Sequence, residues 1–120
     1  TKEAPVHENV KQAIVNAGET DTRLVMRPLR NTERVLNNAA AQKLLEKEAL
    51  LGSNLKFEDI IEDLVGVYPR IMQQGDMESG VWSCGMVAGL VHDIPTCKEL
   101  LDRIMAEARQ IIENRLTAML

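Results

Sequence analysis

The segment from Met72 to Leu100, MQQGDMESGVWSCGMVAGLVHDIPTCKEL, constrains the fold of this chain more than any other part of it. It places Gly80, Gly85 and Gly89 among Val, Met and Leu side chains, and it holds the only tryptophan and both cysteines. Glycine inside an apolar, helix-like segment costs stability, so we expect these glycines to mark a close approach of the backbone to something else. A neighbouring helix and a flat ligand both satisfy that condition.

Composition favours a single helical domain. The chain has 120 residues, of which 45% are hydrophobic but only 2% aromatic. The core must therefore be built from Leu, Ile, Val, Met and Ala, which suits helices. A net charge of −4 and the scarcity of aromatic side chains argue against binding to nucleic acid.

Arginines gather in one short stretch of this acidic chain, at positions 23, 27, 30 and 34. We interpret Arg23, Arg27, Arg30 and Arg34 as a solvated edge or as salt-bridge partners for nearby acids.

The cysteines and the hydropathy pattern indicate a reduced, cytoplasmic protein. Cys84 and Cys97 are too few for a disulfide framework, their spacing fits no metal site, and we expect both to be buried. No signal peptide is present, and no apolar run approaches the ~20 residues that a membrane span needs.

The first part of the chain predicts a helix and then an isolated strand. Apolar residues at helical spacing indicate an amphipathic helix from Val6 to Ala17, with Gly18 as its C-terminal cap. The run Arg23–Arg27, stopped by Pro28, is the only strand that we predict. It would be an edge piece, a connector, or a strand that pairs outside this chain.

Two helices are predicted in the middle of the chain. Asn31 or Thr32 would cap a helix that includes Val35 and Leu36 and runs on to Leu45. Asn54 would cap a second, half-buried helix from Phe57 to Tyr68, and Pro69 would then kink the chain or start a new turn. The second helix would turn its acids outward: Glu58, Asp59, Glu62 and Asp63.

The last helix has the clearest signal. Thr96 and Glu99 form a T-x-x-E capping box after Pro95, and an apolar stripe follows with helical period to the end of the chain. We expect this stripe to pack against neighbouring helices.

No catalytic constellation or metal site is visible. His92 beside Asp93 is interpreted as a surface or capping residue. Gln73 and Gln74 offer amide donors and acceptors that could read the edge of a flavin or a substrate, or could simply cap a helix end. Asp76 and Glu78 could start a further helix through its dipole.

Four segments together resemble the C-terminal part of the nitronate monooxygenase (2-nitropropane dioxygenase) family, in the bacterial branch that includes NADH:quinone reductases. They are APVHENVKQAI, LVMRPLRNTERVLNNA, YPRIMQQGDMESGVWSCGMVAGLVHDIP and CKELLDRIM. The resemblance implies an FMN-dependent (β/α)8 barrel enzyme with a small helical domain inserted near its C-terminus. The family's FMN-phosphate loops and catalytic histidine would lie upstream, so no catalytic residue is expected here.

The resemblance also implies a division of the chain and a set of site residues. Residues 1–18 would hold the helix after the last barrel strand, 19–95 the small helical domain, and 96–120 a closing helix. The small domain would cover the flavin and shape the cleft for a nitronate or quinone and for NAD(P)H. The expected cofactor-side residues are Gln73, Gln74, Gly75, Trp82, Ser83, Gly85 and Met86.

A second hypothesis is a self-standing helical interaction module. The long apolar stripe after Thr96 would then be free to form a homodimer. The chain opens at Thr1 without a methionine, so we expect it to be a part of a longer protein, inactive alone and without bound FMN.

Overall fold

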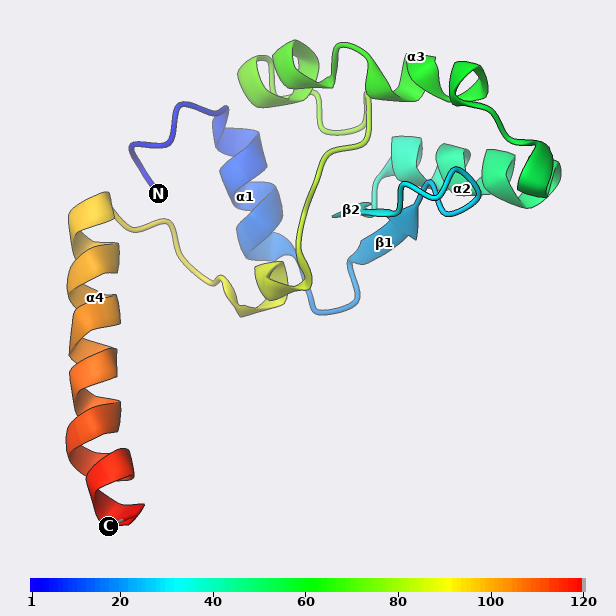
Figure 1. Cartoon of the computed structure of the whole chain (residues 1–120). Coiled ribbons are helices and arrows are strands. Elements are labelled where there is room, and N and C mark those ends of the chain that lie inside the picture. The colour runs from blue at the N-terminus through cyan, green and yellow to red at the C-terminus, as the bar shows by residue number, and fades with distance from the viewer. Residues whose placement is uncertain (120) are drawn as a thin grey trace. The chain divides into compact units, whose positions relative to one another are not determined.

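The computed structural model describes residues 1–119, and these form two compact units. One unit comprises Val6–His92. The other combines Thr1–Pro5 with the chain from Asp93 onward. Helices dominate, as predicted, but the larger unit also contains a small antiparallel sheet (Figure 1).

The first helix of the larger unit, α1 (Glu8–Asn16), matches the prediction except at its end. Its apolar face buries Val10, and Val6, Ile14 and Ala17 pack around the same cluster. The helix ends before Gly18, so the predicted glycine cap is wrong. Instead the Gly18 N–H donates to the Asp21 carboxylate at 2.8 Å, which folds the chain into a turn.

The predicted strand has a partner within the chain. Strand β1 (Thr22–Val25) pairs with β2 (Glu33–Leu36) as an antiparallel hairpin, with Thr22 opposite Leu36. We expected β2 to be the start of a helix, so that expectation and the caps at Asn31 and Thr32 are wrong. The physical reason is burial: Val35 is fully buried when its backbone pairs with β1, and a β-branched residue favours that environment.

Helix α2 (Ala39–Leu51) therefore begins later than predicted. Its N-cap is Asn38, whose side-chain oxygen accepts the Ala41 N–H at 2.9 Å. The Ala39 N–H donates to the Glu78 carboxylate at 2.6 Å, so Glu78 complements the dipole of α2 rather than that of a following helix. Leu44 on this helix is fully buried in the main core.

The predicted helix from Phe57 to Tyr68 is broken into three pieces. A 3₁₀ turn (Phe57–Asp59) leads into the single turn α3 (Ile61–Leu64), and a π-helix (Tyr68–Gln73) follows. The chain leaves α3 because Val65 is extended and Gly66 has a φ of +75°. Pro69 lies in the first turn of the π-helix, which agrees with the prediction that it starts a new turn.

The burial of this broken segment also differs from the prediction. Ile60 is fully buried, but most of the expected apolar stripe is exposed: Phe57, Ile61, Val65 and Tyr68. Asn54 ends a separate 3₁₀ turn (Gly52–Asn54) and caps no helix.

The glycine-bearing segment is mostly irregular rather than helical. It crosses β2 through a bridge between Ser83 and Val35, and between the end of the π-helix at Gln73 and the start of the last helix at Cys97 it forms a 3₁₀ helix (Met86–Leu90). Asp76 starts no helix.

We expected each of these glycines to allow another part of the molecule to approach the backbone closely, and two of them do. A Cβ on Gly80 would lie 2.5 Å from a Val67 methyl, and one on Gly89 would lie 2.8 Å from the Glu19 backbone nitrogen. Gly85 has only ordinary contacts.

The smaller unit contains the long helix α4 (Cys97–Gln110), which continues through a π-helix (Ile111–Leu116) and a 3₁₀ turn (Thr117–Met119). The predicted capping box is confirmed: the Thr96 hydroxyl accepts the Glu99 N–H, and the Glu99 carboxylate accepts the Thr96 N–H at 2.7 Å. The hydrogen bond from the Thr96 backbone is the main reason that the pKa of Glu99 is lowered.

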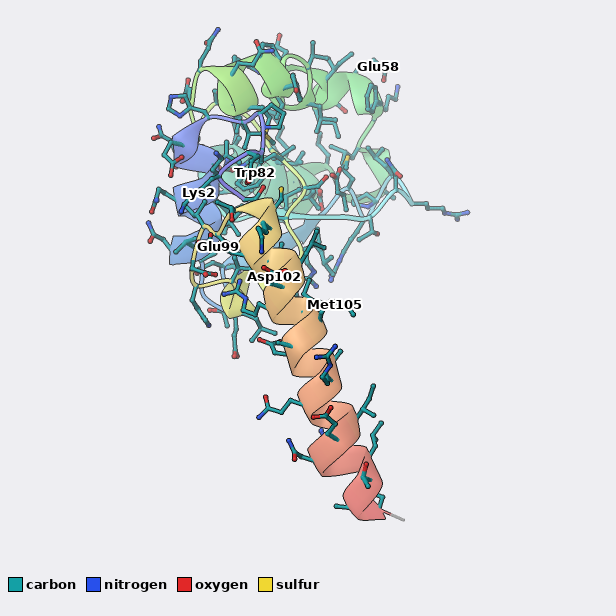
Figure 2. The ribbon with its side chains drawn as sticks, turned by 90° about the vertical axis from the view of Figure 1, so that its left-hand side faces the viewer. Lys2, Glu58, Trp82, Glu99, Asp102 and Met105 are labelled. Carbon is teal, nitrogen blue, oxygen red and sulfur yellow. The ribbon has the colours of Figure 1, made fainter. Side chains whose placement is uncertain are left out.

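The N-terminal residues also cap α4. Both carboxylate oxygens of Glu3 accept the Cys97 N–H, at 3.0 and 2.9 Å, which lowers the pKa of Glu3. Lys2 lies 3.9 Å from the Glu99 carboxylate (Figure 2).

The apolar stripe of α4 is not packed as expected. No residue of α4 is buried, and side chains such as Met105 stand out from the helix (Figure 2). The exposed apolar residues are Leu101, Ile104, Met105, Ile111, Ile112, Leu116 and Met119. No helix within residues 1–119 combines the length and apolar character needed to cross a bilayer.

Candidate functional site

The main candidate site is a pocket of about 530 Å³ within the larger unit. The hairpin contributes Asn31 and Glu33 to it, and the segment that crosses β2 contributes Ser83. The rest of its wall is apolar or aromatic: Met26, Phe57, Leu64, Val67, Tyr68, Met72, Val81 and Trp82.

Trp82 connects this pocket to the core. It is only 6% exposed, and its indole N–H is a buried donor without a hydrogen-bond partner among the described residues. Its carbonyl accepts the Leu36 N–H at 3.3 Å, and the Cys84 N–H donates to the Arg34 carbonyl at 3.0 Å. These backbone bonds on either side of Ser83 fix the wall against β2.

Ser83 faces outward on this wall. Its hydroxyl donates to the Glu33 carboxylate through a short hydrogen bond. Trp82, Ser83 and Gly85 also line a smaller pocket of about 190 Å³, next to Ile14 of α1. Met86 is exposed and lines a third pocket with Glu19, so it lies apart from the main one.

The predicted residues Gln73, Gln74 and Gly75 form a separate group. None of the three lines the main pocket, although the neighbouring Met72 does. Both glutamine side chains are exposed, whereas Gly75 is buried. The structure therefore brings together Trp82, Ser83 and Gly85, and it holds the Gln-Gln-Gly turn elsewhere.

Two residues that sequence reasoning did not select hold that turn in place. The Asn9 side-chain amide donates to the Gly75 carbonyl at 2.9 Å, and the His7 N–H donates to the Met72 carbonyl at 2.7 Å. The His7 ring lies against Gly75, where a Cβ would come within 2.2 Å of Nδ1. A helix start at His7 could be read from the sequence, but its tertiary partner could not.

A buried carboxylate, that of Asp63, forms ion pairs with two partly exposed lysines. Asp63, which we expected to face solvent, is 5% exposed and binds Lys43 at 3.0 Å and Lys47 at 2.7 Å. Its backbone carbonyl accepts the Val81 N–H at 3.3 Å. Asp63 therefore ties α2 to the start of the wall that carries Trp82.

The cysteines differ from each other. Cys84 is buried as expected, and burial raises the pKa of its thiol. Cys97, which we also expected to be buried, is exposed at the start of α4. Within residues 1–119 no cluster of His, Cys, Asp or Glu could hold a metal ion.

The pocket does not fit a complete FMN. Its apolar and aromatic walls suit a flat neutral ring, but its only charged wall residue is Glu33, and no lysine or arginine lines it. A phosphate bound within this pocket would face a carboxylate without a compensating cation.

Comparison with known proteins identifies the family. The sequence model of the family described as nitronate monooxygenase matches residues 1–107. The chain belongs to this family. The predicted resemblance is thereby confirmed.

Two curated relatives match short stretches. One is a (3aS,4S,5R,7aS)-5-hydroxy-7a-methyl-1-oxo-octahydro-1H-indene-4-carboxyl-CoA dehydrogenase from Rhodococcus jostii, 45% identical over 40 residues, which are 33% of this chain and 11% of the relative. The enzyme of the same name from Mycobacterium tuberculosis is 47% identical over 34 residues, 28% of this chain and 10% of the relative.

Two solved structures match nearly the whole chain. FabK from Thermotoga maritima matches with a TM-score of 0.82 and 30% identity. The match covers 96% of this chain and 35% of the FabK chain. A single-residue mutant of that FabK has a TM-score of 0.74 and 28% identity, with coverages of 96% and 32%. The chain thus spans about a third of the solved proteins it matches.

Proposed function

We propose that this chain is the C-terminal part of an FMN-dependent oxidoreductase whose full-length form oxidises nitronates. The observation that carries the proposal is the family match over residues 1–107, supported by the FabK-like fold over 96% of the chain. In this proposal residues 1–18 follow the last strand of a (β/α)8 barrel, 19–95 form the small domain over the flavin, and 96–120 close the fold.

The proposed role of the chain is to position the flavin ring and the substrate and to exclude water from them. Its own residues transfer no proton. The wall of Trp82, Ser83 and Gly85 would border the substrate cleft, and the turn of Gln73, Gln74 and Gly75 would face the flavin ring. FMN, when bound, would supply the redox chemistry. Its phosphate would be held outside this chain, because the pocket offers it no cation.

A glutamine substitution in the full-length protein tests the role of the turn. Gln74→Ala is expected to lower turnover about tenfold, the loss of about one hydrogen bond to the ring or the substrate. The Gln74 side chain is exposed in this unit, so the change should leave the melting temperature unaltered. Steady-state kinetics and the flavin absorbance spectrum provide the readout.

Gln110→Ala on α4 is the matched control, since it removes another exposed amide, from the other unit. Unchanged flavin content and turnover in Gln74→Ala would refute the placement of this turn.

The 120-residue chain purified alone is expected to be colourless, and a yellow chain that keeps FMN would contradict the division of the site.

A second candidate is favoured by one observation, the exposed apolar stripe of α4. A helical interaction module would use this stripe to form a homodimer. Size-exclusion chromatography with light scattering is expected to show a dimer in that case. A strict monomer at all accessible concentrations would exclude the module.

A further inference from the structure

The main pocket gathers every aromatic side chain of this chain. Its sequence contains one phenylalanine, one tyrosine and one tryptophan, and all three of them, Phe57, Tyr68 and Trp82, line the pocket. Trp82 is buried, but Phe57 and Tyr68 are 51% and 60% exposed and belong to neither apolar core cluster of residues 1–119. Two of the three rings are therefore not used to fill the core, and they are accessible to a ligand.

A single carboxylate lies on the same wall. Glu33 is half-buried and is the only charged residue that lines the pocket. A short hydrogen bond from the Ser83 hydroxyl, which lines the pocket as well, holds its side chain there. This bond occupies one carboxylate oxygen, and the other has no hydrogen-bond partner within residues 1–119.

No cation of the protein neutralises this carboxylate. Glu33 forms no ion pair with any residue in the part of the chain that the structure describes. The arginines of the two hairpin strands make other contacts: the Arg23 guanidinium donates to the Thr20 carbonyl at 2.7 Å, and that of Arg34 to the Thr22 hydroxyl at 2.8 Å. The negative charge of Glu33 is therefore available to a cationic ligand.

Aromatic rings together with one carboxylate suit an organic cation. The face of an aromatic ring carries negative electrostatic potential, and it attracts alkylated ammonium groups in particular. A hard metal ion would need several oxygen ligands, and most of this wall is apolar. Alkyl groups on a nitrogen would instead gain contact with such a wall.

We propose that the main pocket binds a small organic cation of the alkylated ammonium class. Its charged nitrogen would lie beside the Glu33 carboxylate and the rings of Tyr68 and Trp82, and its alkyl groups would contact the apolar wall. The volume of about 530 Å³ accommodates such a molecule. The inference goes beyond the proposed function, because every residue of the pocket belongs to the Val6–His92 unit and the test needs no flavin.

Trp82 provides the measurement, because it is the only tryptophan in the chain and it lines the pocket. The 120-residue chain is titrated with choline chloride and, separately, with 3,3-dimethylbutanol, in which a carbon atom replaces the charged nitrogen. Sodium chloride keeps the ionic strength constant. Tryptophan emission and the indole N–H resonance in NMR spectra are recorded. We expect a saturable change with choline, and about tenfold weaker binding of the neutral isostere.

Two variants test the two parts of the site. Glu33→Gln removes the charge but keeps an oxygen for the Ser83 hydroxyl, so it should weaken choline binding about tenfold and leave binding of the isostere unaltered. Tyr68→Leu replaces an exposed ring by an apolar side chain and should weaken choline binding about fivefold. Glu46→Gln, with the same charge change at an exposed position of α2 outside the pocket, is the matched control and should change neither affinity.

Circular dichroism establishes that the variants are folded. Equal binding of choline and its neutral isostere, or no saturable change with choline, would overturn the proposal. It would also be overturned by equal loss of choline binding in Glu33→Gln and Glu46→Gln, or by a Tyr68→Leu variant that binds choline as tightly as the wild type.

Discussion

Gly75→Ala is expected to destabilise the Val6–His92 unit by about 2–4 kcal/mol, the largest effect of any substitution considered for this chain. Gly75 has a φ of +74°, which costs an alanine about 1–2 kcal/mol. The added Cβ would also lie 2.2 Å from His7 Nδ1. The ring would have to move, and the cap that its Nδ1 gives to the Asn9 N–H at 3.1 Å would be lost. Chemical denaturation monitored by Trp82 fluorescence measures the change.

Gly66→Ala is the matched control for backbone strain. Gly66 has nearly the same φ, +75°, but a Cβ there would meet only the Arg70 side chain at 3.6 Å. It should therefore cost about 1–2 kcal/mol, the strain alone. His7→Ser removes the ring and retains a capping oxygen, so it should recover part of the loss in Gly75→Ala. Equal destabilisation by Gly75→Ala and Gly66→Ala would show that the His7 contact is unimportant.

Asp63→Ala is expected to cost about 2–3 kcal/mol at neutral pH, because it leaves the cluster of Lys43 and Lys47 without its carboxylate. The figure is below that of a fully buried pair, since the Lys43 side chain is 58% exposed and water screens it. The variant also weakens the anchor of the wall that carries Trp82. Denaturation midpoints give the loss, and Asp59→Ala, an exposed acid that accepts the Lys56 N–H at 2.9 Å, is the control.

The Asp63 contribution should depend on pH in one direction. Burial by itself would raise the pKa of the Asp63 carboxyl, but the hydrogen bonds and charges of Lys47 and Lys43 outweigh it and lower the pKa below its ordinary value of 3.8. The unfolded chain then takes up the proton at a higher pH than the folded one. The stabilisation is complete above the unfolded pKa and is lost as pH falls through the folded pKa.

The difference in stability between the wild type and Asp63→Asn should therefore shrink in acid, below about pH 4. In the double variant Lys43→Met/Lys47→Met only burial acts on the Asp63 carboxyl, so its carboxylate should give no stabilisation at neutral pH and the loss in acid should disappear. A constant difference from neutral to acid pH would contradict the assigned ion pairs.

Local signals in the sequence were sufficient wherever the backbone hydrogen bonds of a short segment are made within that segment. The capping box of Thr96 and Glu99 and the turn started by Pro69 are as predicted, since each depends on residues within one turn. The helix before Ala17 was also found, because its apolar face has an unambiguous helical period.

Errors occurred where a segment depends on contacts far away in the chain. β2 has a plausible helix pattern, yet Val35 is buried only because β1 and Ser83 lie on either side of it. The predicted helix from Phe57 is interrupted at Gly66, and the π-helix that follows is held by Ile71, which is fully buried in the core. Propensity is weak compared with such burial and pairing.

The sequence by itself determined the family, the helical character and the requirement for close packing at Gly80 and Gly89, but it was wrong at Gly85 and did not select Gly75 for this reason. Only the tertiary structure decided what approaches them: Val67 at Gly80, the Glu19 backbone at Gly89 and the His7 ring at Gly75. It also separated the expected site into the Trp82 wall and the Gln73–Gly75 turn. The physical reason is that a glycine in the sequence indicates a position where a Cβ would not fit. The residue that occupies this space comes from a distant part of the chain, so only the folded structure identifies it.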